Sequence, residues 1–431
     1  MRPGRDPWPS VRLGELMKEV QRPIEVAPEN EYREIGVRSH GRGIFHKDPT
    51  RGADLGEKKV FAIRPGDFVF NIVFAWEGAV AQASEAEMGF IGSHRFPTFR
   101  LNDALVDARF LHWYFTGGYG LFLLGENSPG SAGRNRTLDR SRLLKEKIDL
   151  PRIEEQRSLA RLLDRRTTAI DLAIAKKDRL VDLLSERKQA LITQAVTGRS
   201  TTRVPLTNVE NEWYSEVPAG WKIVPIRHLV RKIEQGWSPS CDSVPPELGQ
   251  WGVLKAGCTA NAAYRATESK ALLPGTAPRP ELEVRSGELI MSRASGSPHI
   301  VGSCAIVAEA GTRLMLSDKL FRLRVQEGHV DARYLWLALA SRPVREQIEI
   351  SISGAEGLAN NLPQSELLSV LVTLPSLAEQ KVIADGVCHA VGLVDALLKK
   401  VRSSVGRLVE YRGTLVASAL TGLLDDERAV A

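Results

Sequence analysis

The stretch LPRIEEQRSLARLLDRRTTAIDLAIAKKDRLVDLLSERKQALITQAVTG, residues 150–198, returns as LPSLAEQKVIADGVCHAVGLVDALLKKVRSSVGRLVEYRGTLVASALTG, residues 374–422. The two copies align without a gap at a constant offset of 224 residues. Gln156 therefore meets Gln380, and Gly198 meets Gly422. Repeats of solenoid proteins are much shorter than this offset, so the pattern indicates a duplicated domain pair.

Apolar residues recur in both copies at alternating steps of three and four, which is typical of a coiled-coil helix. Proline suits the first turn of a helix and glycine its C-terminal cap, so each copy predicts one helix from just after its Leu-Pro to near its Thr-Gly. About 45 residues at roughly 1.5 Å each give a rod of about 65 Å. A rod cannot bury its apolar stripe against itself. We predict an intramolecular coiled coil, with pairing to another subunit as the alternative. The stripe comprises Leu163, Ile170, Ile174, Val181, Leu184, Leu191, Val387, Val394, Leu398, Val405, Leu408 and Leu415.

A segment of roughly 150 residues precedes each rod and reads as mixed strand and short helix. VDARFLHWYF from Val106 and VDARYLWLAL from Val330 keep the offset of 224, and both predict an amphipathic helix capped by an aspartate, Asp107 or Asp331. The loops of the two segments share little. We divide the chain into a first mixed domain 1–149, a helix 150–199, a linker 200–217, a second mixed domain 218–373, a helix 374–424 and a tail 425–431.

Composition indicates an ordinary soluble protein, with 43% hydrophobic and 26% charged residues in a chain of 431. No apolar run predicts a signal peptide or a membrane span. Four cysteines without a CxxC pair disfavour zinc and disulfides, and we expect a cytoplasmic protein without a bound metal. The net charge of +6 falls entirely on the two repeats, so it supports a nucleic-acid partner only weakly.

The LPxxxEQ openings, the helix ending ALITQAVTG and the domain opening PAGWKIVPIRHL resemble the specificity subunit of Type I restriction–modification systems, over nearly the whole chain. The resemblance implies an α+β fold with two mixed α/β target-recognition domains, separated by two long antiparallel helices in a pseudo-two-fold repeat. Each domain would read half of a split site in double-stranded DNA. The helices would bind two methyltransferase subunits, which hold S-adenosylmethionine, and the resemblance leaves open whether two restriction subunits join.

Candidate DNA-binding residues lie in polar stretches outside the rods, where arginine and lysine can contact phosphates and arginine or asparagine can read base edges. GSAGRNRTLDRSR is the densest basic cluster outside the rods and reads as a loop. Asn360 and Asn361 have an alternative role, which is to cap a helix that starts after Pro363. The candidates are Arg134, Asn135, Arg136, Arg140, Arg142, His46, Lys47, Arg51, Arg95, Arg265, Lys270, Arg293, Asn360 and Asn361.

Catalytic signatures are missing from the sequence. Neither the D/N-P-P-Y/F tetrapeptide of amino-methyltransferases nor the GxxxxGK[ST] phosphate loop occurs. We therefore expect a non-catalytic chain that binds no cofactor itself. Two alternatives remain, namely a methylase or nuclease that acts alone and a coiled-coil scaffold with protein-binding end domains.

Overall fold

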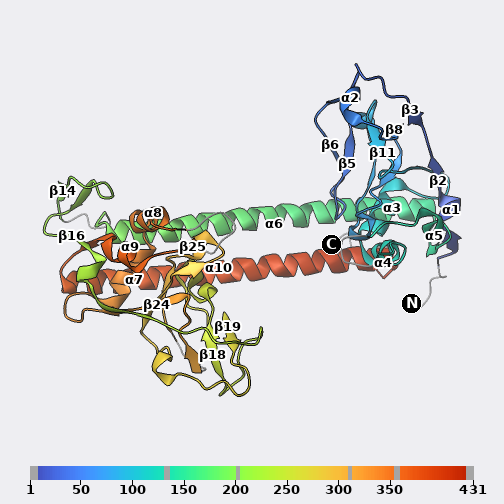
Figure 1. Cartoon of the computed structure of the whole chain (residues 1–431). Helices are drawn as coiled ribbons and strands as arrows, with labels where there is room; N and C mark the ends of the chain where they lie inside the picture. Colours follow the sequence, from blue (N-terminus) through green and yellow to red (C-terminus); the bar gives the residue numbers. More distant parts are fainter. Residues whose placement is uncertain (1–7, 131–135, 200–203, 309–312, 354–359, 424–431) are drawn as a thin grey trace. The chain divides into compact units, whose positions relative to one another are not determined.

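The computed structural model describes residues 8–130, 136–199, 204–308, 313–353 and 360–423 and has an α+β fold (Figure 1). The chain divides into two compact units. Unit 1 comprises Met1–Asp178 together with Ser403–Ala431, and unit 2 comprises Arg179–Arg402. Each unit thus contains one mixed domain and one part of each long helix.

The two long helices are α6 (Ile153–Val196) and α10 (Leu377–Leu420), each of 44 residues. Their bounds differ by the offset of the repeat at both ends, which confirms the prediction of two equivalent helices. Each helix stops two residues before a glycine with a left-handed backbone, Gly198 at φ +73° and Gly422 at φ +70°. Such a residue ends a helix at low cost only when it is glycine, which explains why both copies close on Thr-Gly.

In unit 1 the beginning of α6 packs against the end of α10 (Figure 1), and Leu163, Ile170 and Leu415 are buried there. An ion pair joins Asp171 to Arg412 at 2.8 Å. In unit 2 the end of α6 faces the beginning of α10, where Val394 and Leu398 are buried. The remaining residues of the predicted stripe are half-buried, namely Ile174, Val181, Leu184, Leu191, Val387, Val405 and Leu408.

The unit 2 helices carry the equivalent ion pair, between Lys188 and Asp395 at 2.9 Å. Asp395 stands 224 residues after Asp171, and Arg412 stands 224 residues after Lys188. The basic partner therefore comes from α6 in unit 2 and from α10 in unit 1. Such reciprocal pairing follows directly when two copies of one helix run antiparallel.

The domain of unit 1 is built on a four-stranded antiparallel sheet of order β10-β9-β12-β2 and a three-stranded antiparallel sheet of order β11-β8-β3. Phenylalanines from the four-stranded sheet and from the following helix form its core. The strand bounds in the two sheets are β2 Met17–Val20, β3 Pro23–Ile24, β8 Val60–Ala62, β9 Phe68–Phe70, β10 Val80–Gln82, β11 Ile91–Ser93 and β12 Thr98–Leu101.

The domain of unit 2 repeats the four-stranded sheet in the same strand order, as β22-β20-β24-β17. Its three-stranded sheet, β19-β18-β23, differs because β18 and β23 run parallel. The frame of the domain is thus duplicated, whereas its outer sheet has diverged. The strand bounds are β17 Val230–Gln235, β18 Trp251–Leu254, β19 Ser269–Ala271, β20 Leu289–Ser292, β22 Cys304–Ile306, β23 Arg313–Met315 and β24 Leu320–Val325.

Two short helices follow the sheet in each unit. Asp107 caps the first helix of unit 1 by accepting the N–H groups of Arg109 and Phe110, and Asp331 caps its equivalent in unit 2, as predicted. These pairs of helices link each sheet to the rods. Their bounds are α3 Ala108–Thr116 and α4 Gly118–Glu126 in unit 1, and α7 Ala332–Ala340 and α8 Arg342–Ile350 in unit 2.

The glutamine of each LPxxxEQ motif fastens a rod to its domain. The buried Gln156 side chain accepts the Asp107 N–H at 2.8 Å and donates to the carbonyls of Leu105 and Pro151, both at 2.8 Å. Gln380 makes the equivalent three bonds, to the N–H of Asp331 and the carbonyls of His329 and Pro375. The motif is therefore a structural joint between a helix start and a helix cap.

Smaller elements complete the two units. The pairs β1–β13 and β16–β26 stand at equivalent places beside the starts of the domains and of the rods. No helix in the part of the chain that the structure describes is both long and apolar enough to cross a membrane. The remaining bounds are β1 Ser10–Arg12, α1 Leu13–Leu16, β4 Glu31–Tyr32, β5 Ile35–Val37, β6 Ile44–His46, β7 Thr50–Arg51, α2 Gly52–Leu55, η1 Ala75–Glu77, η2 Glu85–Glu87, α5 Arg140–Leu143, β13 Lys147–Asp149, β14 Leu206–Asn208, β15 Glu216–Pro218, β16 Lys222–Pro225, η3 Ile226–His228, η4 Ala256–Ala262, η5 Pro280–Leu282, β21 Ala294–Ser295, η6 Pro298–Ile300, β25 Asn360–Asn361, α9 Gln364–Ser369 and β26 Leu371–Leu374.

Candidate nucleic-acid interface

Three of the predicted residues, Arg293, Asn360 and Asn361, lie together in unit 2, where β21 pairs with β25. The Oδ1 atom of Asn361 accepts a hydrogen bond from Nη2 of Arg293 at 2.7 Å, and the guanidinium lies 5.4 Å from the centre of the Phe321 ring. Both contacts fix the direction of the arginine fork. A guanidinium held in this way can bind the edge of a base or a phosphate without losing further side-chain entropy.

The alternative role of the two asparagines, as helix caps, is wrong. Helix α9 has Pro363 at its N-cap and no side-chain cap. Asn361 instead exchanges two backbone hydrogen bonds with Ser353, at 2.8 and 2.9 Å. The asparagines therefore belong to a short strand pair beside Arg293.

A cavity of about 420 Å³, which we call the lysine cavity, is lined by Lys255, Lys270 and Lys319. The backbone N–H of Arg293 donates to the Lys319 carbonyl at 2.8 Å, so the cavity adjoins the cluster of Arg293 and the asparagines. Lys255 and Lys270 have no hydrogen bond or ion pair from their ammonium groups to any other described residue. Of the three lysines, only Lys270 was among the predicted candidates.

Polar groups between these lysines complete the lining. Asp318 pairs with Lys319 at 3.1 Å and accepts a short hydrogen bond from the Ser238 hydroxyl. Partial burial raises the pKa of Asp318, but the bonds from Ser238 and Lys319 and the charges of Lys319 and Arg293 outweigh it and lower the pKa. Asp318 is therefore ionised at neutral pH.

The Ser317 side chain, also in the lining, is 3% exposed, and its hydroxyl has no hydrogen-bond partner among the described residues. A buried hydroxyl without a partner costs about 1–3 kcal/mol. Three ammonium groups face one carboxylate here, so the lining carries a positive balance. Ammonium and hydroxyl donors around a concave site suit an anion such as a phosphate.

The basic cluster of unit 1 is only in part the loop that the sequence predicts. Arg140 and Arg142 lie on helix α5, and the loop prediction is therefore wrong for these two residues. The helix begins here because the Asp139 side chain caps it by accepting the Arg142 N–H. The Arg140 guanidinium pairs with Glu19, whereas Arg142 is exposed. Arg134 and Asn135 lie outside the described residues.

The other candidates of unit 1 divide into paired and exposed side chains. The His46 imidazole contacts the Glu87 carboxylate at 2.7 Å, and Lys47 pairs with Glu34 at 3.4 Å. Burial raises the pKa of Glu87, but its hydrogen bonds to His46 and Ser84 and the charge of His46 lower it overall. Both basic residues thus have partners within their own unit.

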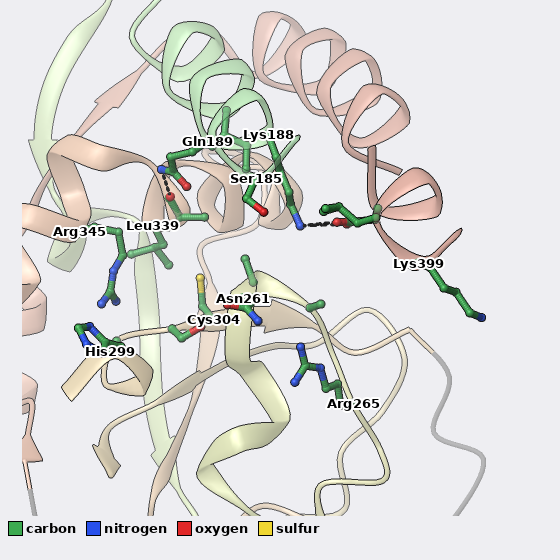
Figure 2. A pocket seen from close by; sticks show the side chains of 18 of the residues that line it. Ser185, Lys188, Gln189, Asn261, Arg265, His299, Cys304, Leu339, Arg345 and Lys399 are labelled. Atoms are coloured by element: carbon green, nitrogen blue, oxygen red, sulfur yellow. Dashed lines mark hydrogen bonds and ion pairs between the residues drawn. The ribbon is translucent and has the colours of Figure 1, made fainter. Parts of the chain in front are cut away.

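Three arginines of unit 1 are better placed for an external partner. The Arg136 guanidinium lies 5.5 Å from the centre of the Trp76 ring. Arg51 and Arg95 are exposed, and neither side chain has a partner among the described residues. The predicted Arg265 belongs to unit 2, where it lines a separate, larger cavity against the rods (Figure 2).

No family model matches the sequence. The chain is 29% identical over 241 residues to the Type I restriction enzyme EcoEI specificity subunit of Escherichia coli, a match that covers 56% of this chain and 40% of that protein. It is 23% identical over 288 residues to the EcoKI specificity subunit of E. coli K12, covering 64% of this chain and 57% of that one. The chain thus spans about half the length of the curated relatives it matches, and their names confirm the resemblance stated for the sequence.

Two solved structures share the fold over nearly the whole chain. One is a chain from the "structural basis underlying complex assembly and conformational transition of the type I R-M system", with a TM-score of 0.67 at 19% identity, covering 97% of this chain and 99% of that one. The other is the HsdS subunit of Thermoanaerobacter tengcongensis, with a TM-score of 0.51 at 18% identity and 98% coverage of both chains. Two mixed domains on two long helices are therefore a shared architecture.

Proposed function

We propose that the chain is a non-catalytic DNA-specificity subunit of a Type I restriction–modification complex, in which each unit reads one half of a bipartite site. The observation that carries the proposal is the contrast within the duplication. The same four-stranded order and the same glutamine joint occur in both units, whereas the outer sheets and the basic loops differ. Two equivalent frames with different loops suit the reading of two different sequences, because loops on a rigid frame carry specificity.

In unit 2 we propose a division of labour between the two neighbouring sites. The lysine cavity would contact the DNA backbone, since Lys255, Lys270 and Lys319 offer charge without planar geometry. Arg293 and Asn361 would face base edges, because a guanidinium pairs with guanine and an amide with adenine. The exposed Arg51, Arg95 and Arg142, together with Arg136 beside Trp76, are the corresponding candidates in unit 1.

The rods supply the proposed docking surface for two methyltransferase subunits, which would hold S-adenosylmethionine. Outside the apolar stripe, the rods expose large apolar side chains, which supports burial by a partner. The proposed complex can also include two restriction subunits. The exposed residues are Leu172, Leu180 and Leu183 on α6 and Val382, Leu393, Leu397, Val409 and Tyr411 on α10.

The test is to co-express the chain with its methyltransferase subunit and to map methylated adenines across a host genome by single-molecule sequencing. A split motif with one constant gap is the expected result, and cells with the methyltransferase subunit alone serve as control. A complex that assembles and binds S-adenosylmethionine but adds no methylation would contradict the proposal and favour a protein scaffold. Methylation or cleavage by the purified chain alone would favour an independent enzyme.

A second arm tests the rods as the spacer that sets the gap. One heptad inserted after Leu184 and one after the equivalent Leu408 would keep the helices in register. Seven residues lengthen a helix by about 10 Å, or roughly three base pairs at about 3.4 Å each. We expect the gap in the methylated motif to grow by about three base pairs. An unchanged gap in an intact complex would exclude the spacer role.

A further inference from the structure

A cavity of about 510 Å³ lies within unit 2, between the rods and the domain. We call it the helix cavity. Its walls come from α6, α10, the η4 segment and the start of α8, and Figure 2 shows Gln189, Asn261, Arg265 and Arg345 around it. The proposed reading of DNA by the lysine cavity and by Arg293 does not use this space.

Cationic side chains outnumber the single carboxylate in the lining. Lys188 is neutralised by Asp395 at 2.9 Å, and Arg345 donates to the Val301 carbonyl at 2.9 Å. Arg265, Lys399 and Arg402 also line the cavity, and in the described part of the chain none of these three side chains has a hydrogen-bond or ion-pair partner. The only carboxylate in the lining, Asp395, is already paired. The cavity therefore has an uncompensated positive charge.

The backbone beside Arg265 is held in an unfavourable conformation. Asn261 and Ala262 have left-handed backbones, with φ values of +60° and +55°, and both line the cavity. For alanine this region costs on the order of 1–2 kcal/mol, and such residues persist where the surrounding structure fixes them, often at ligand sites. The strained residues lie in the segment that carries the Asn261 and Arg265 side chains, which face the rods (Figure 2).

The repeat shows that this charge is particular to unit 2. Lys399 and Arg402 correspond to Ala175 and Asp178 in the first copy of the repeat, and Gln189 corresponds to Gly413 in the second. The helices do not require polar or cationic side chains at these positions, because both copies form the same helix. All three residues line the cavity, so the sequence difference between the copies changes the chemistry of the cavity.

We propose that the helix cavity is a phosphate-binding site, which takes either a phosphate of the DNA backbone or the phosphate of a free ligand. The unpaired guanidinium groups of Arg265 and Arg402 in the lining are donors that phosphate oxygens require, and Lys399, whose side chain points away from the other lining residues in Figure 2, adds positive charge nearby. The DNA source rests on the proposed function, whereas the free-ligand source does not depend on it.

The test replaces the two exposed cations by their counterparts in the first repeat, as K399A/R402D in the full-length chain. Ala175 and Asp178 are compatible with the same helix, so the fold should persist. The matched control, K400A/R407D, makes the same charge change at exposed helix positions that do not line the cavity. Equal unfolding midpoints of the three chains would verify that any loss of binding is local.

The first arm measures the binding of inorganic phosphate by ³¹P NMR line broadening. All chains in this arm also carry K255A/K319A, which removes two of the three lysines of the lysine cavity. We expect K399A/R402D, but not its control, to weaken phosphate binding about tenfold, which corresponds to loss of charge-assisted hydrogen bonds. The second arm measures the salt dependence of binding to a DNA duplex. Each lost phosphate contact reduces the steepness of the plot of log binding constant against log salt concentration by about 0.9.

A lower slope for K399A/R402D alone assigns the cavity to the DNA backbone. Weaker phosphate binding with an unchanged DNA slope assigns it to a free phosphorylated ligand. If K399A/R402D equals its control in both arms, the phosphate site is excluded. Failure of the proposed function would be seen separately, as wild-type chain without sequence-selective methylation in its complex.

Discussion

Unit 1 and unit 2 are alike where a domain meets a rod and different where each domain meets solvent. Gln156 and Gln380 make the same three hydrogen bonds, and the four-stranded sheets share one strand order. The outer sheet of unit 2 contains a parallel strand pair, where the described residues of unit 1 show only an isolated parallel bridge between Glu34 and Ile91. The cations that line the two cavities belong to unit 2. The comparison separates residues that hold the frame from residues that can specify a partner.

A buried carboxylate shows how far this likeness extends into the sheets. Asp67 accepts the N–H of Arg64 at 2.9 Å and pairs with Arg22 and Arg100. Glu288 likewise accepts the Arg285 N–H at 2.9 Å and pairs with Arg324, the equivalent of Arg100, at 2.7 Å. Each carboxylate follows a turn glycine, Gly66 or Gly287, so the turn and the ion pair are duplicated together.

The strongest way to break the comparison is to remove the glutamine joints. Gln156→Leu and Gln380→Leu each leave one partly buried N–H and two carbonyls without their partner, and we expect each to cost about 3 kcal/mol of unfolding free energy. If the frames are equivalent, the two losses agree within about 1 kcal/mol. Urea denaturation followed by circular dichroism measures both, and Gln194→Leu on the exposed face of α6 is the control.

Cysteine labelling assigns each loss to its unit, because all four cysteines lie in unit 2. Burial raises the pKa of the Cys258 and Cys304 thiols to about 12, so both should resist a thiol reagent until unit 2 unfolds. Cys241 and Cys388 are partly exposed. Gln380→Leu should therefore speed labelling of Cys304 more than Gln156→Leu does. The reverse order would contradict the assignment of the joints.

A smaller effect is expected where the frames differ by one hydroxyl. The buried Tyr334 donates to the Thr373 carbonyl at 3.0 Å, whereas Phe110 occupies the equivalent position in unit 1. Tyr334→Phe should cost about 1 kcal/mol. Phe110→Tyr should cost less, because the Asp149 carbonyl is equivalent to that of Thr373 and can accept the hydroxyl. A greater loss for Phe110→Tyr in thermal denaturation would show that the two frames are not superimposable there.

The sequence predicts the two long helices but not the cavity lined by the three lysines. The helix bounds follow from local signals, since a proline and a glycine stand at the ends of the periodic stripe in each copy. In the first copy these residues are Pro151 and Gly198. The lysine cavity could not be predicted, because Lys255, Lys270 and Lys319 come from separate loops whose meeting depends on the pairing of distant strands. The Gln156 joint carried a signal, its place in a repeated motif, but the sequence does not reveal its partners.

The rod ion pairs should differ modestly between the units. Lys188 is 13% exposed beside Asp395, whereas Arg412 is 36% exposed beside Asp171. Exposed pairs contribute about 0.2–1 kcal/mol. Double-mutant cycles with alanine should give a coupling near the upper end for Lys188–Asp395 and near the lower end for Arg412–Asp171. Equal couplings would mean that the difference in exposure has no energetic consequence.

The smallest effect concerns the helix cap of unit 2 in acid. Burial raises the pKa of Asp331, but hydrogen bonds from the Arg333 side chain and from the N–H groups of Arg333 and Tyr334 outweigh it and lower the pKa overall. Because the folded pKa lies below the unfolded value of about 3.9, the carboxylate stabilises the fold above that pH. This contribution is lost as the pH falls through the folded pKa.

Asp331→Asn keeps an oxygen for the cap and removes the charge. We expect a slightly lower Tm than wild type at pH 7, and a difference that shrinks toward pH 3, where the wild-type carboxylate begins to be protonated. Asp182→Asn, at an exposed position of α6, is the matched control. A difference between Asp331→Asn and wild type that stays constant from pH 7 to pH 3 would assign the effect to cap geometry, and the charge would then have no part in fastening this helix.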